Sequence, residues 1–227
     1  MTYKLLIGQK SYSSWSLRGW LCFDPFDIPV KVTSTLIYSD AFQDEVAAFG
    51  GAGTVPAVVT PEGGLLTDSL AIAWHLAEAF PVKRLLPTDP KDRAEAQSII
   101  AEMHAGFTAL RGACPMNLRN GWAGFAPSET VLADLARIET IWQRALARSG
   151  GPFLYGDFTL ADAFYAPVAT RLLTYALPMS APVAGYADAI AAHPSFRQWR
   201  ADGLAEDTEL AVYDKPLART DWPAPAR

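Results

Sequence analysis

Residues 54–69 read TVPAVVTPEGGLLTDS and contain the pattern that decides the fold. Two short apolar runs, 56–60 and 65–67, flank a glycine turn and predict a β-hairpin. Pro56 has no N–H to donate to a sheet. A cis bond before this proline would leave the backbone N–H and C=O of Val55 free to pair with an extended peptide.

The same stretch ends where a helix begins. Asp68 and Ser69 precede an apolar helix predicted over 70–80, so a hydroxyl and free N–H groups are offered to a carboxylate. Together with the free backbone of Val55, this helix start predicts a pocket for a small anionic peptide. Each feature alone also fits a structural turn or a plain helix cap.

The residues before the hairpin alternate strand and helix signals. Apolar and β-branched runs predict strands over 3–8 and 30–37, and serines at 13 and 14 begin a helix that runs to about Phe23. A weaker helix over 40–49 is stopped by Gly50 and Gly51. A βαβ unit followed by a hairpin predicts a mixed sheet with helices on its faces.

The chain changes character at residue 81. A segment with three prolines, 81–90, predicts a linker. Apolar residues at helical spacing then predict helices over 91–112, 128–149, 159–177 and 187–203. We therefore expect an α/β domain over 1–80, an all-α domain over 91–205 and a polar tail over 206–227.

Composition excludes several classes of protein. The 227 residues carry a net charge of −5, which disfavours a nucleic-acid binder. The two cysteines form neither a disulfide framework nor a metal motif, so we expect a reduced compartment and no metal. Without a signal-peptide pattern or an apolar run of about 20 residues, we expect a cytoplasmic protein and no membrane partner.

The second chemical signal is the segment SYSSWSLR over 11–18. It holds several hydroxyls at a helix start but no His, Asp or Glu that would serve as a general base, so a serine nucleophile lacks a partner. A hydroxyl that donates to a thiolate of the substrate fits better. Lowering a thiol pKa by two units requires only about 2.7 kcal/mol. A serine-rich turn that merely caps the helix is the alternative.

A third motif, Gly156-Asp-Phe-Thr159-Leu-Ala-Asp162, has the spacing of a capping box and predicts a structural helix start. Val55-Pro56, Asp68-Ser69 and this box, in that order over residues 3–205, resemble the cytosolic glutathione S-transferases. The resemblance implies a thioredoxin-like α/β domain followed by an all-α domain. It also implies that Val55 pairs with the cysteinyl backbone of glutathione, beside Pro56, and that Asp68 and Ser69 hold the γ-glutamyl end.

The resemblance places the catalytic residue at the start of the first helix. We expect Ser13 first, then Ser14, then Ser11, which matches a serine of the zeta-like (maleylacetoacetate isomerase) pattern. Tyr12 is a further alternative. The absence of cysteine from 11–18 disfavours thiol transfer of the omega type, and residues 103–117 resemble a bacterial subgroup.

Two parts of the pocket are less well defined by the resemblance. Family members often hold the glycyl carboxylate with Lys, Gln or His before Val55, where this chain has small residues, so Gln43 or backbone N–H groups are the candidates. The candidates for the electrophile site are His104, Phe107, Arg111 and Trp122. Tyr165 and Arg171, on the helix after the capping box, are weaker pocket candidates.

The resemblance thus implies a glutathione transferase of serine type that uses glutathione as co-substrate, with a small hydrophobic electrophile as partner. It also implies a homodimer. Three alternatives remain: a zeta-like glutathione-dependent isomerase, a glutathione-dependent peroxidase or reductase, and a non-catalytic binding protein with this fold.

Overall fold

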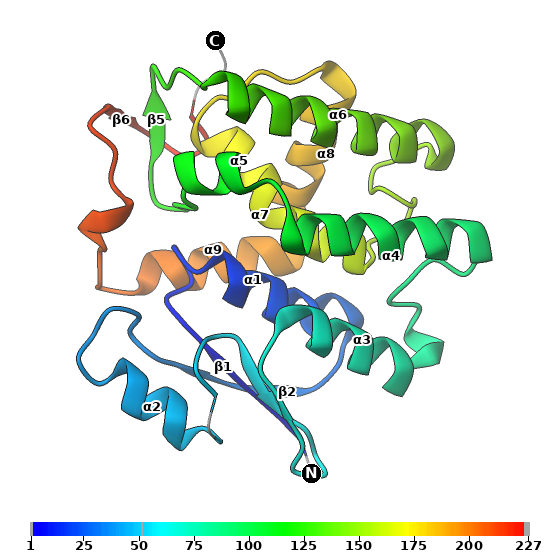
Figure 1. Ribbon diagram of the computed structural model, residues 1–227, viewed down its shortest axis with the longest axis vertical. Coiled ribbons are helices and arrows are strands. Elements are labelled where there is room, and N and C mark those ends of the chain that lie inside the picture. Colours follow the sequence, from blue (N-terminus) through cyan, green and yellow to red (C-terminus); the bar gives the residue numbers. More distant parts are fainter. Residues whose placement is uncertain (1, 51, 225–227) are drawn as a thin grey trace.

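The computed structural model describes residues 2–50 and 52–224. Gly51, which belongs to the glycine pair expected to stop the second helix, and residues 225–227 of the predicted tail lie outside the described residues. Figure 1 shows a small half built around a sheet and a larger helical half, with the N-terminal helix between them.

The first half is a mixed sheet in the order β2-β1-β3-β4. β1 runs parallel to β2 and antiparallel to β3, which pairs in turn with β4. The sequence predicted this hairpin and this mixed sheet. The strands are β1 (Tyr3–Ile7), β2 (Val30–Ser34), β3 (Ala57–Val59) and β4 (Leu65–Leu66).

Helices cover both faces of this sheet, because alternate residues of its central strand point to opposite sides. Leu6 packs with Val46 and Ala57 on one face, under α2 (Phe42–Ala48). Leu5 and Ile7 belong to the main core on the other face, beside α1 (Ser14–Leu21) and α3 (Ser69–Ala79). Two short 3₁₀ turns, η1 (Asp24–Phe26) and η2 (Pro81–Lys83), follow α1 and α3.

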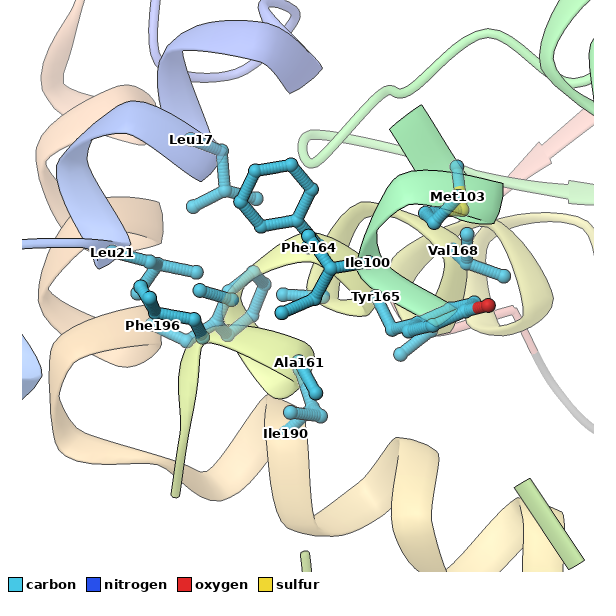
Figure 2. Packing of buried hydrophobic residues seen from close by; sticks show 14 of the residues in the cluster. Leu17, Leu21, Ile100, Met103, Ala161, Phe164, Tyr165, Val168, Ile190 and Phe196 are labelled. Atoms are coloured by element: carbon cyan, nitrogen blue, oxygen red, sulfur yellow. The ribbon is translucent and has the colours of Figure 1, made fainter. Parts of the chain in front are cut away.

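The second half is helical and is organised around one buried helix. Nearly every residue of α7 is buried, and α7 contacts α1, α4 and α8. Figure 2 shows Leu17 and Leu21 of α1 meeting Phe164 of α7 and Phe196 of α9. The helices are α4 (Pro90–Ala105), α5 (Thr108–Ala113), α6 (Glu129–Ser149), α7 (Leu160–Thr174), α8 (Ala181–Ala192) and α9 (Pro194–Ala205).

The predicted capping box begins α7. The carboxylate of Asp162 accepts the N–H of Thr159 at 2.8 Å and the N–H of Leu154 at 3.1 Å. Burial raises the pKa of Asp162 to about 6. A buried acid that satisfies two backbone donors fixes the start of the central helix. The thioredoxin-like half followed by an all-α half confirms the predicted fold class.

Two expectations about the helical half differ from the structure. The helix predicted over 91–112 is two helices, because Gly106 is extended and Phe107 has a left-handed φ of 56°. The helix predicted over 187–203 is α8 and α9, divided before Pro194, which cannot continue the hydrogen bonds of α8.

The tail is also more structured than its polar composition predicts. It contains a 3₁₀ turn, η3 (Ala211–Tyr213), and a strand, β6 (Ala218–Thr220). β6 pairs with β5 (Gly121–Ala123), a strand that lies within the loop between α5 and α6. Figure 1 shows this pair at the side of the helical half.

Candidate active site

A cleft of about 1000 Å³ lies between the two halves of the molecule. Its walls come from the start of α1, the loop after β2, the segment before β3, the region around α4 and α5, α7 and the tail. Among the residues proposed from sequence, the cleft is lined by Tyr12, Ser13, Ser14, Gln43, Val55, His104, Arg111 and Arg171.

The two serines at the start of α1 have different surroundings. Ser13 is the N-cap: its Oγ accepts the N–H of Ser16 at 3.3 Å and donates to Ser16 Oγ at 2.8 Å. Ser14 is the first residue of α1 and is half-buried. Its Oγ accepts a long hydrogen bond, 3.4 Å, from Nη2 of Arg171. The Ser14 hydroxyl can therefore still donate a hydrogen bond to an acceptor in the cleft.

Ser11 does not line the cleft. Its side chain is completely buried, and its Oγ donates to the carbonyl of Gly203 at 2.9 Å. This hydroxyl ties the start of α1 to α9, which is a structural contact.

Val55 is open to the cleft in the way the sequence suggested. The Val55–Pro56 bond is cis. Neither the N–H nor the C=O of Val55 makes a hydrogen bond to another described residue. Pro56 is buried behind it, close to Gly19 of α1, where an added Cβ would lie 2.7 Å from the Cβ of Pro56. A free N–H and C=O pair beside the cleft suits an extended peptide.

Asp68 and Ser69 begin α3 close to the cleft without being part of its lining. Asp68 caps α3 by accepting the N–H of Leu70 at 2.7 Å, and its other oxygen lies 3.5 Å from Nε2 of His104. Ser69 is buried, and its Oγ has no hydrogen-bond partner among the described residues. A buried hydroxyl without a partner at a helix start is a candidate donor for a bound carboxylate.

The cleft is electrostatically positive. Arg111 and Arg171 line it, and no Asp or Glu does so within the part of the chain that the structure describes. Arg171 is held by hydrogen bonds to the carbonyls of Cys114 (2.7 Å) and Pro167 (2.8 Å). Burial and repulsion from Arg111 lower the pKa of Arg171 to about 10. Both guanidinium groups remain charged at neutral pH and favour an anionic ligand.

A third arginine lies beside these two. Arg18 is 1% exposed, and its Nε and Nη1 have no hydrogen-bond partner among the described residues. It stacks 4.6 Å from the ring of Trp15, which Arg111 approaches to 4.8 Å. Burial, together with repulsion from Arg171 and Arg111, lowers the pKa of Arg18 to about 9. Trp15 thus offers its π system to two cations.

Comparison with known proteins identifies the family. Residues 12–79 match the model of the glutathione S-transferase N-terminal domain, and residues 93–202 match that of the C-terminal domain. The chain belongs to the glutathione S-transferase family. The expected family and enzyme class are therefore confirmed.

Named relatives of this glutathione S-transferase include two isomerases. A maleylacetoacetate isomerase of Pseudomonas aeruginosa is 31% identical over 86% of this chain and 94% of the relative. A probable maleylacetoacetate isomerase of Caenorhabditis elegans is 29% identical over 70% of this chain and 73% of the relative. Among solved structures, a glutathione transferase homologue from Burkholderia with bound glutathione has a TM-score of 0.69 and 20% identity, covering 91% of this chain and all of that one.

Two of the predicted electrophile-site residues of this glutathione S-transferase do not line the cleft. Phe107 is buried and packs near Tyr165, with ring centroids 6.5 Å apart. Trp122 is 1% exposed on β5, where the guanidinium of Arg219 covers its ring. Both aromatic rings stabilise the helical half, because apolar surface at these positions is removed from water.

Several residues that line the cleft of the transferase were not predicted from the sequence, notably Trp15, Tyr38 and Tyr213. Arg171, a weaker pocket candidate from the sequence, does line the cleft, and it carried a signal: an arginine within the otherwise apolar helix 160–174 requires a buried partner or a ligand. Tyr213 carried none, because nothing in a polar tail indicates which part of the body it contacts.

Within residues 2–50 and 52–224, the transferase has no group of three or more His, Cys, Asp or Glu side chains placed to hold a metal ion. In the same residues, no helix has the length and apolar character needed to cross a membrane.

Proposed function

We propose that this chain binds glutathione with its backbone beside Val55, its γ-glutamyl end at Ser69 and its sulfur at the start of α1. The open backbone of Val55 and the unpartnered hydroxyl of Ser69 support this orientation. Gln43, which lines the cleft at its exposed side, is the candidate for the glycyl end.

The Ser14 hydroxyl is the proposed donor to the thiolate, with Ser13 as the helix cap. Ser13 already exchanges hydrogen bonds with Ser16, whereas Ser14 receives one from Arg171 and has its own proton to give. Free N–H groups and the positive end of the α1 dipole act on the same point. The expected result is a larger thiolate fraction of glutathione at neutral pH.

The second substrate is proposed to be an electrophile that carries a carboxylate. The observation that carries this proposal is the pair Arg111 and Arg171 in a cleft without an acidic lining residue. The thiolate adds to a double bond conjugated with a carbonyl group, forming a C–S bond, and a proton is taken up at the neighbouring carbon. Release of this thioether is glutathione transfer.

A second candidate, cis–trans isomerisation, is favoured by the names of the two relatives. Here the same adduct rotates about what has become a single bond. The neighbouring carbon then gives up the proton that it took up, the C–S bond breaks, the double bond re-forms in the trans geometry, and the glutathione thiolate is regenerated. A glutathione peroxidase would instead convert two glutathione molecules into the disulfide while reducing a hydroperoxide.

A homodimer in the cytoplasm completes the proposal. Dimers are common in this family. Cys22 and Cys114 are both buried and unpaired, which agrees with a reducing compartment. Sedimentation would test the oligomeric state.

The first test is calorimetric titration with glutathione. Ser69→Ala should weaken binding about tenfold or more, because a hydrogen bond to a charged group is lost. Ser128→Ala, at the N-cap of α6 and outside the cleft, is the matched control and should bind like the wild type. Absence of saturable binding by the wild type at millimolar glutathione would overturn the proposal.

The second test uses cis-4-oxopent-2-enoate and its methyl ester as probes. Loss of glutathione with formation of a thioether indicates transfer, whereas the trans isomer at constant glutathione indicates isomerisation. The carboxylate should be preferred over the neutral ester. Equal rates for the two would contradict an anionic substrate, and glutathione disulfide formed with a hydroperoxide would indicate the peroxidase.

A further inference from the structure

The C-terminal tail forms part of the active-site cleft. Residues 206–224 lie beyond residues 93–202, the part matched by the C-terminal family model, yet Tyr213 in η3 lines the same cleft as Ser14 and Arg171. Figure 1 shows the tail, in red, returning from α9 along the side of the helical half.

The end of the tail is anchored to the helical half. Residues 218–220 pair with 121–123, and Gly121 is required there because an added Cβ would lie 2.5 Å from Thr220 Oγ1 and 2.8 Å from Ala224. Trp222 Nε1 donates to Thr174 Oγ1 at 2.9 Å, at the end of the helix that carries Arg171. These contacts hold the tail against α7.

The beginning of the tail is anchored near the start of α1. The carboxylate of Glu206 accepts the N–H of Lys10 at 3.1 Å, just before the serine-rich segment. Arg119 donates to the carbonyls of Gly203 (2.8 Å) and Glu206 (3.2 Å). The part of the tail that contains Tyr213 is therefore fixed at both ends, as expected of a wall and not of a mobile lid.

The ring of Tyr213 is supported by a second aromatic ring. Its centroid lies 4.9 Å from that of Tyr12, which is 3% exposed and precedes α1. Tyr38, in the loop after β2, lies 6.4 Å away on the exposed side. Tyr12 lines the cleft beside Tyr213, and the contact between the two rings restricts movement of the Tyr213 ring.

We propose that Tyr213 is a specificity-determining residue whose fixed ring limits the length of the carbon chain that an electrophile extends past its reacting double bond. The inference rests on the proposed function, because it assumes that the electrophile lies between the start of α1 and the arginines. Short electrophiles pack against the ring, and long ones collide with it.

The test measures binding of chemically prepared thioethers and therefore does not depend on turnover. Glutathione is added to cis-4-oxopent-2-enoate and to cis-4-oxodec-2-enoate, which has five more carbons, and each adduct is titrated by calorimetry beside S-methylglutathione. In the wild type the short adduct should bind more tightly than the long one. Tyr213→Ala should shift this ratio about tenfold toward the long adduct.

Two further variants separate the ring from the tail as a whole. Tyr213→Phe keeps the ring and should behave like the wild type. Val212→Ala changes the neighbouring residue of η3, which is 69% exposed and does not line the cleft, and should also leave the ratio unchanged. S-methylglutathione should bind equally to all four proteins.

The outcomes distinguish the two proposals. A ratio that stays within twofold of the wild type in Tyr213→Ala overturns the role of Tyr213, as does an equal shift in Val212→Ala. Adduct selectivity that depends on Tyr213, with no turnover of the free probes, overturns the proposed catalysis and leaves the inference intact. Failure of the wild type to bind S-methylglutathione overturns both.

Discussion

Nη2 of Arg171 lies 3.4 Å from Oγ of Ser14, which joins a buried cation in α7 to the first residue of α1. The contact crosses from the helical half to the thioredoxin-like half at the edge of the cleft. Because arginine only donates, the hydroxyl accepts from it and can donate in turn to an anion. A thiolate there would have the serine hydroxyl, the α1 dipole and a nearby positive charge acting on it together.

Removal of the Ser14 hydroxyl should therefore change the acidity of bound glutathione. In Ser14→Ala, the thiol pKa of bound glutathione should rise by about one unit, since a hydrogen bond to a charged acceptor stabilises it by about 1.5 kcal/mol. The ultraviolet absorbance of the thiolate, recorded against pH in the binary complex, measures this pKa.

Ser13→Ala is the matched variant one residue earlier. It should lower the free energy of unfolding by about 1 kcal/mol, because the α1 cap is lost, while changing the thiol pKa less. If Ser13→Ala raises the thiol pKa and Ser14→Ala does not, the assignment of the two serines is reversed.

The positive cleft should discriminate between charged and neutral electrophiles. Arg111→Gln should lower kcat/KM for cis-4-oxopent-2-enoate about tenfold or more, since a charge-assisted contact to the carboxylate is removed, and should leave the methyl ester nearly unaffected. Arg144→Gln, an exposed residue paired with Glu95 outside the cleft, is the control. An equal loss with both probes would indicate a structural effect of Arg111.

The close contact between α1 and the segment before β3 should tolerate no added methyl group. In Gly19→Ala the new Cβ would meet the rigid ring of Pro56 at 2.7–2.8 Å, so we expect a loss of about 1–3 kcal/mol in the free energy of unfolding. Glutathione should also bind more weakly, because Val55 adjoins Pro56.

Gly185→Ala is the control for helix propensity. Gly185 is in α8 and an added Cβ would meet nothing within 4 Å, so alanine there should stabilise the protein by up to about 1 kcal/mol. Denaturant unfolding of both variants measures the difference. Similar stabilities for the two variants would show that α1 can move away from Pro56 at little cost.

The sequence predicted the elements whose signals are local. The hairpin, the N-cap residues and the capping box depend on neighbours within a few positions, and all three are present. Periodicity could not detect the break between α4 and α5. Apolar spacing continues through Gly106 and Phe107, and only the left-handed backbone at Phe107 ends the pattern.

The cleft was harder to predict, because its walls come from distant segments. Phe107 and Trp122, two aromatic residues of the second domain, were expected there, but both are buried within the helical half and neither lines the cleft. Tyr213 reaches the cleft because the tail is held at Glu206 before it and by the pairing of β6 with β5 after it. Such contacts depend on tertiary packing, which composition and spacing do not specify.

His193 should make the stability of the fold depend on pH. It is the N-cap of α9, where its Nδ1 accepts the N–H of Ser195 at 3.2 Å, and its ring lies 4.4 Å from that of Phe158. Burial lowers the pKa of His193 below its ordinary value of 6.5, against a weaker opposing effect of Asp24. Protonation would also remove the lone pair that caps the helix.

The sign of the effect follows from this lowered pKa. Near and below pH 6.5 the unfolded chain binds a proton at His193 more readily than the folded protein does. The contribution of His193 to the free energy of unfolding is therefore fully present above pH 6.5 and is lost as the pH falls. The uptake of one proton changes the slope of the free energy of unfolding against pH by at most about 1.4 kcal/mol per pH unit. His193→Asn keeps a neutral capping acceptor and should reduce the pH dependence of the free energy of unfolding, measured in denaturant between pH 5 and 7.5. Because all other titrating groups are common to both proteins, the difference between the two curves isolates His193, and parallel curves would contradict its role.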